Sequence, residues 1–427
     1  MNEEEKDKLI DNLFDVTDTD QLMETILELM YEYITEFPYS ITEPDFHEIF
    51  IENIHSLLTV QFENQLEENE FLEEDLEEMI EEAVKIFYST IIPERSLLES
   101  TIIQPLNQEM MYKLEKQITY LKNKPQPDQR TKEWYEFRRN LLTASNAYKA
   151  FENQNVQNQL IYEKCSEIEN KENNQPININ TPFHWGQKYE PVSIMIYEDQ
   201  FNTKIGDFGC IQHSFYPFLG ASPDGINIDK SSDRYGRMLE IKNVVNREID
   251  GIPKKEYWVQ MQLQMETCDL DECDFLETMF IEYSSETEFL TDGSFFTSNE
   301  NERKGIIMYF NKPDGNPHYI YKPLYMDQEE FIEWEEYQID NIPMTWIKNI
   351  YWRLKINSCV LVQRNRKWFQ DNIHQLKNIW SIIEKERKEG FEHRAPIKRI
   401  KNNNQPIEEK TVCLLKIHSK VGINQNE

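Results

Sequence analysis

The chain has 427 residues, of which 39% are hydrophobic and 12% aromatic, enough for two or three domains with sizeable cores. It holds no apolar run of about 18 residues, which argues against a membrane span. The first residues, Met-Asn-Glu-Glu-Glu-Lys, lack the basic and apolar parts of a secretion signal. We therefore expect a protein of a cytoplasmic or nuclear-type reducing compartment that is neither secreted nor bound to a membrane.

The net charge of −33 by itself argues against nucleic acid as a partner, because phosphate binding needs cations. The charge is unevenly distributed, however. Residues 1–90 hold 27 acids and 3 lysines, a net of −24, whereas residues 344–401 hold 14 Lys and Arg against 5 acids, a net of +9. The sequence thus predicts an acidic head, a mixed middle and a basic C-terminal segment.

Residues 1–120 are predicted to be helical. Apolar residues recur at helical spacing over 9–14 and 22–30, and 71–87 alternates acidic pairs with Leu, Met, Ile and Val. We expect a helical bundle with an acidic outer face. The polar segment 122–130 contains two prolines and is predicted to be a linker.

The middle of the chain mixes helices and strands. A helix is expected over 132–151, then a short helix and a loop over 152–182, and a further helix from Gly186 towards Gln200. The predicted elements that follow are strands within 203–228 and 237–246, a helix over 254–267, and strands over 278–283 and 305–310 with a loop between them.

From Gln328 onward the pattern predicts helices, including a long basic helix near 360–388. The aromatic residues of this segment are expected in the core, with the cations in solvent or on phosphate. The expected domains are an acidic helical domain (1–121), a core of helices and strands (122–345) and a basic helical segment with its tail (346–427).

Six cysteines are scattered along the chain without a CxxC pair: Cys165, Cys210, Cys268, Cys273, Cys359 and Cys413. No second pair or histidine lies near Cys268 and Cys273 at the spacing of a zinc site. We expect reduced, mostly buried thiols. An iron–sulfur cluster with ligands distant in sequence stays a less favoured alternative.

Two short motifs contain the candidate chemistry. Gly-Ala-Ser-Pro-Asp224-Gly predicts a tight turn that leaves Asp224 at a strand end. In Met-Leu-Glu240-Ile-Lys242-Asn, two charges interrupt an apolar strand and share one face, because side chains alternate along a strand. Buried together, they must pair or bind a metal. A hairpin with a surface salt bridge is the plain alternative, since other Glu-x-Lys triplets in this chain lie in polar surroundings.

Three further pieces lie around these motifs. Glu190 follows Gly186 by one helical turn and can bring a third carboxylate to the same cleft. Gln260 and Gln264 share one helical face and can donate amide hydrogen bonds. Arg138, near the start of the middle region, suits phosphate binding. Each piece alone also has a purely structural interpretation. Glu190 can be a solvated side chain, the two glutamines can belong to an ordinary amphipathic helix, and Arg138 can belong to a helix anchored by its aromatic residues.

The order of the five pieces resembles the lambda-exonuclease or YqaJ-like viral recombinase family of PD-(D/E)xK nucleases. The pieces are Trp-x3-Arg with Thr-Ala-Ser, Gly-x3-Glu, Ser-Pro-Asp-Gly, Glu-x-Lys and Tyr-x2-Gln-x-Gln, spread over about residues 130–285. The resemblance implies an α/β fold with a mixed central sheet flanked by helices. CRISPR-associated RecB-type nucleases share this core, but their four-cysteine cluster is not matched here.

The resemblance also implies an activity, Mg²⁺-dependent digestion of duplex DNA from an end, with Mn²⁺ as a possible substitute. It assigns a metal site to Glu190, Asp224, Glu240 and Ile241, and catalysis to the three carboxylates with Lys242 and Gln262. A pocket for the 5′-phosphate, which would give 5′→3′ digestion, is implied for Arg138, Ser145, Ser222 and Gln260.

Two functions follow as hypotheses. The leading one is a DNA exonuclease of recombination, repair or defence against foreign DNA, encoded by a virus, acting on double-stranded ends as a homo-oligomer. The alternative is a DNA- or protein-binding module on a catalytically degenerate nuclease fold. The acidic head is expected either to be a solvated bundle or to bind a protein partner, dimerise, or compete with DNA for the basic segment.

Overall fold

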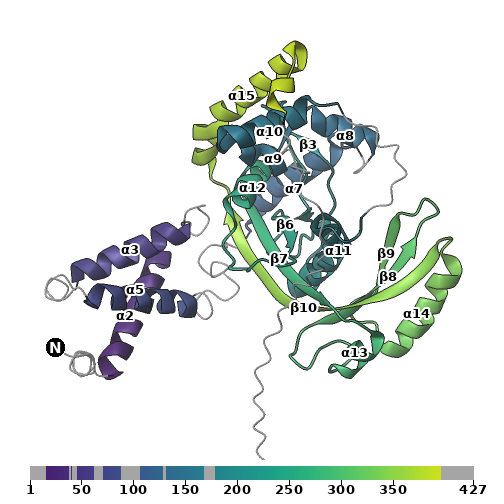
Figure 1. Ribbon diagram of the computed structural model, residues 1–427, viewed down its shortest axis with the longest axis horizontal. Helices are drawn as coiled ribbons and strands as arrows, with labels where there is room; N and C mark the ends of the chain where they lie inside the picture. The colour runs from purple at the N-terminus through teal and green to yellow at the C-terminus, as the bar shows by residue number, and fades with distance from the viewer. Residues whose placement is uncertain are drawn as a thin grey trace, which may run out of the picture.

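The computed structural model describes residues 16–37, 40, 46–61, 71–87, 106–127, 131–167 and 178–395. Figure 1 shows a helical head and a larger body built on a long, curved sheet. The helix expected over 9–14, Cys413 and the polar tail lie outside the described residues.

The head consists of helices α2 (Val16–Glu36), α3 (Phe46–Gln61) and α5 (Phe71–Ile86). Ile26 and Met30 of α2 are fully buried one turn apart, while Glu24 and Glu28 are exposed. This is the arrangement that apolar residues at helical spacing impose, because one stripe faces the core. The described part of the head is therefore a helical bundle, as predicted.

Helix α7 (Gln108–Asn123) packs on the body although its residues were assigned to the acidic domain. Gln117 Nε2 donates to the Cys268 carbonyl at 2.5 Å, and Leu121 is fully buried in the core of the body. Lys124, just beyond the helix, donates to the Gln212 carbonyl at 2.7 Å. The body thus begins before residue 122, because these contacts are far apart in sequence and invisible to a boundary drawn from composition.

The helix expected over 132–151 is broken. Leu142 donates to the Phe218 carbonyl at 2.7 Å and starts a short parallel pairing, which ends the first helix. The elements of this part are α8 (Lys132–Arg139), β1 (Leu142–Thr143), α9 (Ala144–Ala147), η4 (Tyr148–Phe151), α10 (Gln154–Cys165) and α11 (Pro182–Gln200).

The strands form two sheets, one in the order β1-β4-β3 and a seven-stranded one in the order β2-β5-β6-β7-β10-β8-β9. The pairs β1–β4 and β6–β7 are parallel and the others antiparallel, so the sheet is mixed, as the expected fold class requires. Their bounds are β2 (Ile205–Gly206), β3 (Ile211–Gln212), β4 (Leu219–Ala221), β5 (Gly225–Asn227), β6 (Met238–Asn243), β7 (Glu272–Glu282), β8 (Lys304–Asn311), β9 (Pro317–Tyr321) and β10 (Thr345–Gln363).

Strand β10 corrects the expected helical segment from residue 346. Its 19 residues pair with β7 on one side and β8 on the other. The stretch is rich in aromatic and β-branched residues, which favour a pleated surface over a helix. The remaining helices are α12 (Lys255–Cys268), α13 (Glu286–Thr291), α14 (Gln328–Asn341), α15 (Arg366–Glu389) and η5 (Glu392–Arg394).

Helices α11 and α12 cover opposite faces of β6. Leu239 and Ile241 pack with Tyr197 of α11, whereas Met238 packs with Trp258 of α12. Because side chains alternate along a strand, Glu240 and Lys242 share the α12 face with Met238. Figure 1 shows α11 beside β6 and α12 above it, where β7 begins and β10 ends.

Several cations of the basic segment form ion pairs within the body. Arg364 pairs with Glu266 at 2.6 Å, Arg366 with Asp271 at 2.6 Å and Arg394 with Glu386 at 2.5 Å. Trp352, Phe369 and Trp380 are buried, as expected for the aromatics, while Trp346 is 41% exposed. Contact between these cations and phosphate stays a prediction.

The thiols match the expectation within the described residues. Five free, buried cysteines occur there: Cys165, Cys210, Cys268, Cys273 and Cys359. Among the described helices, none is both long and apolar enough to cross a membrane.

Candidate active site

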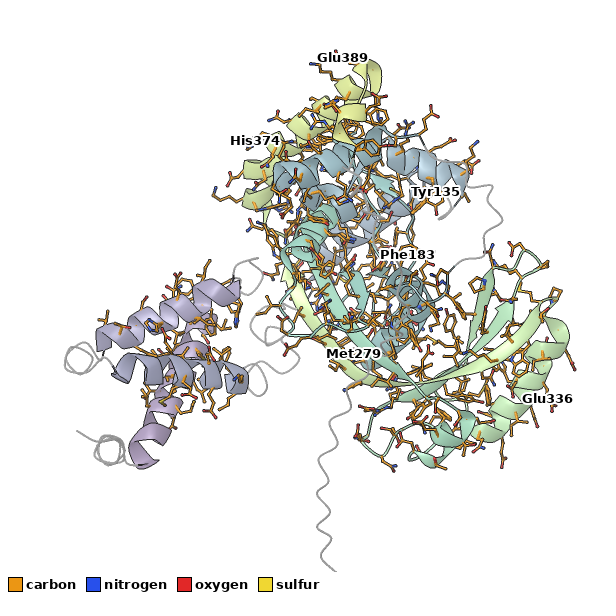
Figure 2. The ribbon with its side chains drawn as sticks, in the orientation of Figure 1. Tyr135, Phe183, Met279, Glu336, His374 and Glu389 are labelled. Carbon is orange, nitrogen blue, oxygen red and sulfur yellow. The ribbon has the colours of Figure 1, made fainter. Side chains whose placement is uncertain are left out.

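A cavity of about 810 Å³ lies at the end of β6, between α8, α11 and α12. Tyr135 marks α8 and Phe183 marks the start of α11 in Figure 2. Phe183 is 77% exposed at the rim of the cavity. The sequence-predicted residues that line the cavity are Arg138, Ser145, Glu190, Ser222, Asp224, Glu240, Ile241, Lys242, Gln260 and Gln264.

The Glu240 carboxylate is almost fully enclosed, with 1% of the residue exposed. Its Oε1 accepts from Gln260 Nε2 at 2.7 Å and from the Lys242 ammonium, and its Oε2 accepts from Gln264 Nε2 at 2.7 Å. A buried carboxylate is tolerated only when such donors replace water. Both oxygens are thus held in a fixed orientation by α12 and by the neighbouring residue of β6.

Asp224 lies in the bend between β4 and β5, where the Pro-Asp-Gly motif predicts a turn. Its Oδ2 accepts from the Ile241 backbone N–H at 2.7 Å, which ties the bend to β6. Gly225 begins β5, and a Cβ there would lie 2.1 Å from the Ile205 side chain. The glycine is therefore required by close packing against β2 rather than by a positive φ.

The pKa of the Asp224 carboxyl is strongly shifted by its surroundings. Burial raises its pKa well above the usual range, and the negative charges of Glu240 and Glu190 raise it further. Lys242 acts in the opposite direction. Three carboxylates thus repel one another around a single lysine, and a bound cation would relieve that repulsion.

The Lys242 ammonium stays charged. Burial would lower its pKa, but Glu240 and Asp224 outweigh burial and raise the pKa above its ordinary value. The ammonium also lies 4.8 Å from the centre of the Tyr257 ring. The lysine is therefore held as a cation at the wall of the cavity.

Asn243, which the motifs did not single out, joins β6 to α11. Its Nδ2 donates to the Gly186 carbonyl at 3.0 Å, and its Oδ1 accepts from Ser193 and Thr278, each at 2.7 Å. Gly186 and Ser193 bracket Glu190 on α11. The position next to Lys242 is the one signal in the sequence that could have drawn attention to Asn243.

The donor set fits a hard divalent cation, which prefers carboxylate and carbonyl oxygens. Asp224, Glu240 and Glu190 lie close enough to perturb one another, and Ile241 lines the same cavity. Within the described ranges, however, no group of three or more His, Cys, Asp or Glu side chains is arranged so that it could hold a metal ion. A cation would have to share Glu240 with Lys242.

Three of the four residues expected to bind a terminal phosphate, Arg138, Ser145 and Ser222, meet at one end of the cavity. Arg138 Nη1 donates to Ser222 Oγ at 3.0 Å, and Nη2 donates to Ser145 Oγ at 3.2 Å. The guanidinium lies 4.4 Å from the centre of the Trp134 ring. Within the described residues Arg138 forms no ion pair with a carboxylate, so this cation and two hydroxyls suit an anion.

Gln262 does not line the cavity, contrary to expectation. Its Nε2 donates to the Gln363 carbonyl at 2.8 Å and its Oε1 accepts from the Asn365 N–H at 2.6 Å, so it connects α12 to the junction of β10 and α15. Residues two apart on a helix point to opposite sides, whereas residues four apart share a face. Gln264 therefore joins Gln260 on Glu240.

The fold and the site define a mixed α/β protein with a carboxylate–lysine cluster on one central strand and a cation–hydroxyl pocket beside it. Comparison with known proteins names the domain. Residues 133–271 match the family described as the YqaJ-like viral recombinase domain. This part of the chain is thus similar to that family, as the motifs predicted.

Similar proteins were found by sequence and by structure. An uncharacterized protein of Acanthamoeba polyphaga mimivirus is 30% identical over 310 residues, which is 62% of this chain and 54% of that protein. The chain thus spans about half the length of this curated relative.

Two solved structures resemble the fold weakly. The alkaline exonuclease LHK-Exo of Laribacter hongkongensis is 17% identical, with a TM-score of 0.36 and coverage of 61% of this chain and 95% of that one. A phage-related exonuclease of Haemophilus somnus is 12% identical, with a TM-score of 0.30 and coverage of 60% and 96%.

Proposed function

We propose that this protein is a metal-dependent DNA nuclease that digests duplex DNA from its ends in the 5′→3′ direction. The observation that carries the proposal is the convergence of Asp224, Glu240 and Lys242 with the Arg138 pocket in one cavity. A scissile phosphate at the carboxylates and a terminal phosphate at the arginine would then be bound by the same opening.

Asp224, Glu240 and Glu190, with the Ile241 carbonyl, would hold the metal. Mg²⁺, or Mn²⁺ in its place, would supply positive charge to the attacked phosphate and acidify a water molecule. Lys242 would orient that water and offset charge on the phosphate, since its ammonium is held as a cation. Gln260 and Gln264 would keep both oxygens of Glu240 aimed into the cavity.

The direction of digestion would come from the end that is recognised. The guanidinium of Arg138 and the hydroxyls of Ser145 and Ser222 present donors to one anion. Gln260 was expected in the same pocket, and its amide nitrogen instead donates to Glu240, so we assign it to the carboxylate side.

Three further proposals concern the whole protein. The acidic helical head, whose core includes Leu361 of β10, is proposed to bind a protein partner, while the body and the basic C-terminal segment bind DNA ends. A homo-oligomer would keep the enzyme on its strand. Origin in a virus is supported by the mimivirus relative.

The test uses the full chain with linear 5′-phosphorylated, linear 5′-hydroxyl and circular duplex DNA, with and without Mg²⁺. We expect Mg²⁺-dependent loss of linear DNA, fastest with the 5′-phosphate, and intact circles. Asp224→Asn and Lys242→Met should abolish digestion while the protein still binds ends. Binding without turnover in Mg²⁺ or Mn²⁺ would instead support the degenerate binding module.

A further inference from the structure

A buried lysine lies directly behind the proposed phosphate pocket. Lys164, in the last turn of α10, is 6% exposed, and its Nζ donates to the backbone carbonyl of Arg138 at 2.9 Å. The same residue whose guanidinium faces the cavity is therefore held from the interior through its main chain.

Lys164 belongs to a group of four cations. Arg139 donates to the Ser166 carbonyl at 2.9 Å, and Arg387 of α15 donates to the carbonyls of Lys164 and Arg139 at 2.7 and 2.6 Å. In the described part of the chain, none of the four pairs with a carboxylate. This absence is notable in a protein whose net charge is −33, where acids are abundant.

Helix termini explain part of this arrangement. The last carbonyls of α8 and α10 lack partners within their helices, and cations at a helix C-terminus are favourable. That accounts for the hydrogen bonds of Arg139 and Arg387, which are not enclosed as Lys164 is. It does not account for an enclosed ammonium, because burial of an unpaired charge is costly.

Charged groups on the elements packed around Lys164 shift its pKa. Burial, followed by the positive charges of Arg138 and Arg387, lowers the pKa of Lys164 to about 7, while the Cys210 thiol and Glu163 act in the opposite direction. Glu163 itself pairs with Lys149 at 3.0 Å. An anion in the adjacent pocket is the group that could favour the ammonium form.

We propose that Lys164 is a positioning residue for Arg138, whose ammonium fixes the end of α8 and adds positive charge behind the pocket, so that its protonation and the binding of a terminal phosphate favour each other. This inference rests on the proposed function, because it requires that Arg138 bind a phosphate.

A dependence on pH follows. Below about pH 7 Lys164 carries its proton and supports the phosphate, and above it the neutral amine supports the phosphate less. The terminal phosphate itself gains its second charge through about pH 6. Preference for a 5′-phosphate over a 5′-hydroxyl end should therefore fall as the pH rises beyond 7. A shift of half to one unit in the lysine pKa on binding corresponds to a loss of about threefold to tenfold.

The experiment measures binding of 5′-phosphoryl and 5′-hydroxyl duplexes to the full chain by fluorescence anisotropy without metal, and their digestion with Mg²⁺, from pH 6.5 to 9. The ratio between the two ends removes pH effects common to both, including those of Asp224. We expect the wild-type ratio to fall about threefold to tenfold. Lys164→Arg, which keeps its charge, should hold a constant ratio, and Lys164→Met should show the low ratio throughout.

Lys385→Met is the matched control, because it removes one charge from an exposed lysine of α15 and should keep the wild-type pH dependence. A wild-type fall in the ratio for Lys164→Arg would overturn the proposal, as would a wild-type ratio for Lys164→Met. If Lys164→Met fails to fold, Lys164→Arg decides. If the proposed nuclease function is wrong, neither the 5′-phosphoryl nor the 5′-hydroxyl DNA is digested. The ratio of their binding by anisotropy still tests the role of Lys164.

Discussion

Two buried charge clusters lie on the same pair of strands, on opposite faces. On the α11 face, Asp274 of β7 pairs with Arg234 and Arg237, and Arg237 also donates to Glu272 at 3.0 Å. On the α12 face, Glu240 of β6 has Lys242 as its cation while Asp224 and Glu190 lie nearby.

The first cluster is balanced, with two acids and two arginines, and the second has three acids and one lysine. Both central carboxylates are 1% exposed, so burial does not distinguish them. The balanced cluster carries no excess charge and links β7 to the residues that lead into β6. The unbalanced one opens into the cavity, and we propose that a cation from outside balances its charge.

The largest effect is expected on digestion, when one acid of the unbalanced cluster is neutralised. Asp224→Asn keeps the shape of the side chain and removes one of three repelling charges. We expect digestion to fall by about 10⁴-fold, about 5.4 kcal/mol of transition-state stabilisation. The free energy of unfolding at neutral pH should stay the same or rise. Single-turnover digestion and urea denaturation of the same preparation would check both halves, and an active or unfolded variant would refute the contrast.

The balanced cluster should behave in the opposite way. Asp274→Asn removes the negative charge that two buried guanidinium groups share, which should destabilise the fold by about 3–5 kcal/mol. Residual folded protein should retain its turnover per molecule. Urea midpoints, with digestion rates scaled to the folded fraction, would test this, and lost turnover in well-folded protein would mean that Asp274 serves catalysis.

Two glutamines on α12 sharpen the comparison within one helix. Gln264→Ala removes a donor from Glu240 and should lower Mg²⁺ affinity or digestion by about 10–100-fold. Gln262→Ala removes contacts at the junction of β10 and α15, so it should cost about 1–3 kcal/mol of stability and spare the metal response. Mg²⁺ titrations of the two variants would test this assignment. A weakened Mg²⁺ response in Gln262→Ala together with a normal one in Gln264→Ala would contradict it.

The smallest effect is in the pH dependence of stability without metal. The folded pKa of Asp224 is raised above its unfolded value of about 3.9 by burial and by Glu240 and Glu190. The folded state therefore keeps a proton that the unfolded chain has lost, and stability falls as the pH rises from about 4 through the folded pKa. Asp224→Asn should lack this slope.

Mg²⁺ should offset that loss at neutral pH. At ten times its Kd, a bound cation adds about 1.4 kcal/mol to the free energy of unfolding. Thermal melting of wild type and Asp224→Asn, each with and without Mg²⁺, would measure it. An equal rise in Tm in both proteins would contradict binding at this carboxylate cluster.

Local sequence patterns predicted much of the candidate site. Alternation along β6 placed Glu240 and Lys242 on one face, and the Pro-Asp-Gly run placed Asp224 at a strand end. The choice between Gln262 and Gln264 could not be made in the same way, because α12 is buried on nearly all sides and has no polar face to set its rotation. Asn243 and Lys164 act through partners distant in sequence, which no local pattern reveals.

The fold shows the same limit. Helices of the head and most elements around the site follow from apolar spacing. Strand β10 was missed because its pairing with β7 and β8 involves residues from 34 (Thr345 with Asn311) to 91 (Gln363 with Glu272) positions away along the chain. Only that pairing makes a strand of a segment whose charges resemble those of the basic helix after it.

Strand β10 has a consequence for how the polypeptide comes to be folded. The recognised domain covers residues 133–271, whereas β6 pairs in parallel with β7, which begins at Glu272, and β7 in turn pairs with β10 up to Gln363. During synthesis β6 can pair with β7 once about 40 residues after β6 have left the ribosome, whereas β7 lacks β10 until about 80 further residues have followed. We expect a fragment limited to 133–271, which lacks β7, to aggregate through its open sheet edge, and one that extends from α7 through α15 to stay in solution with the candidate site complete.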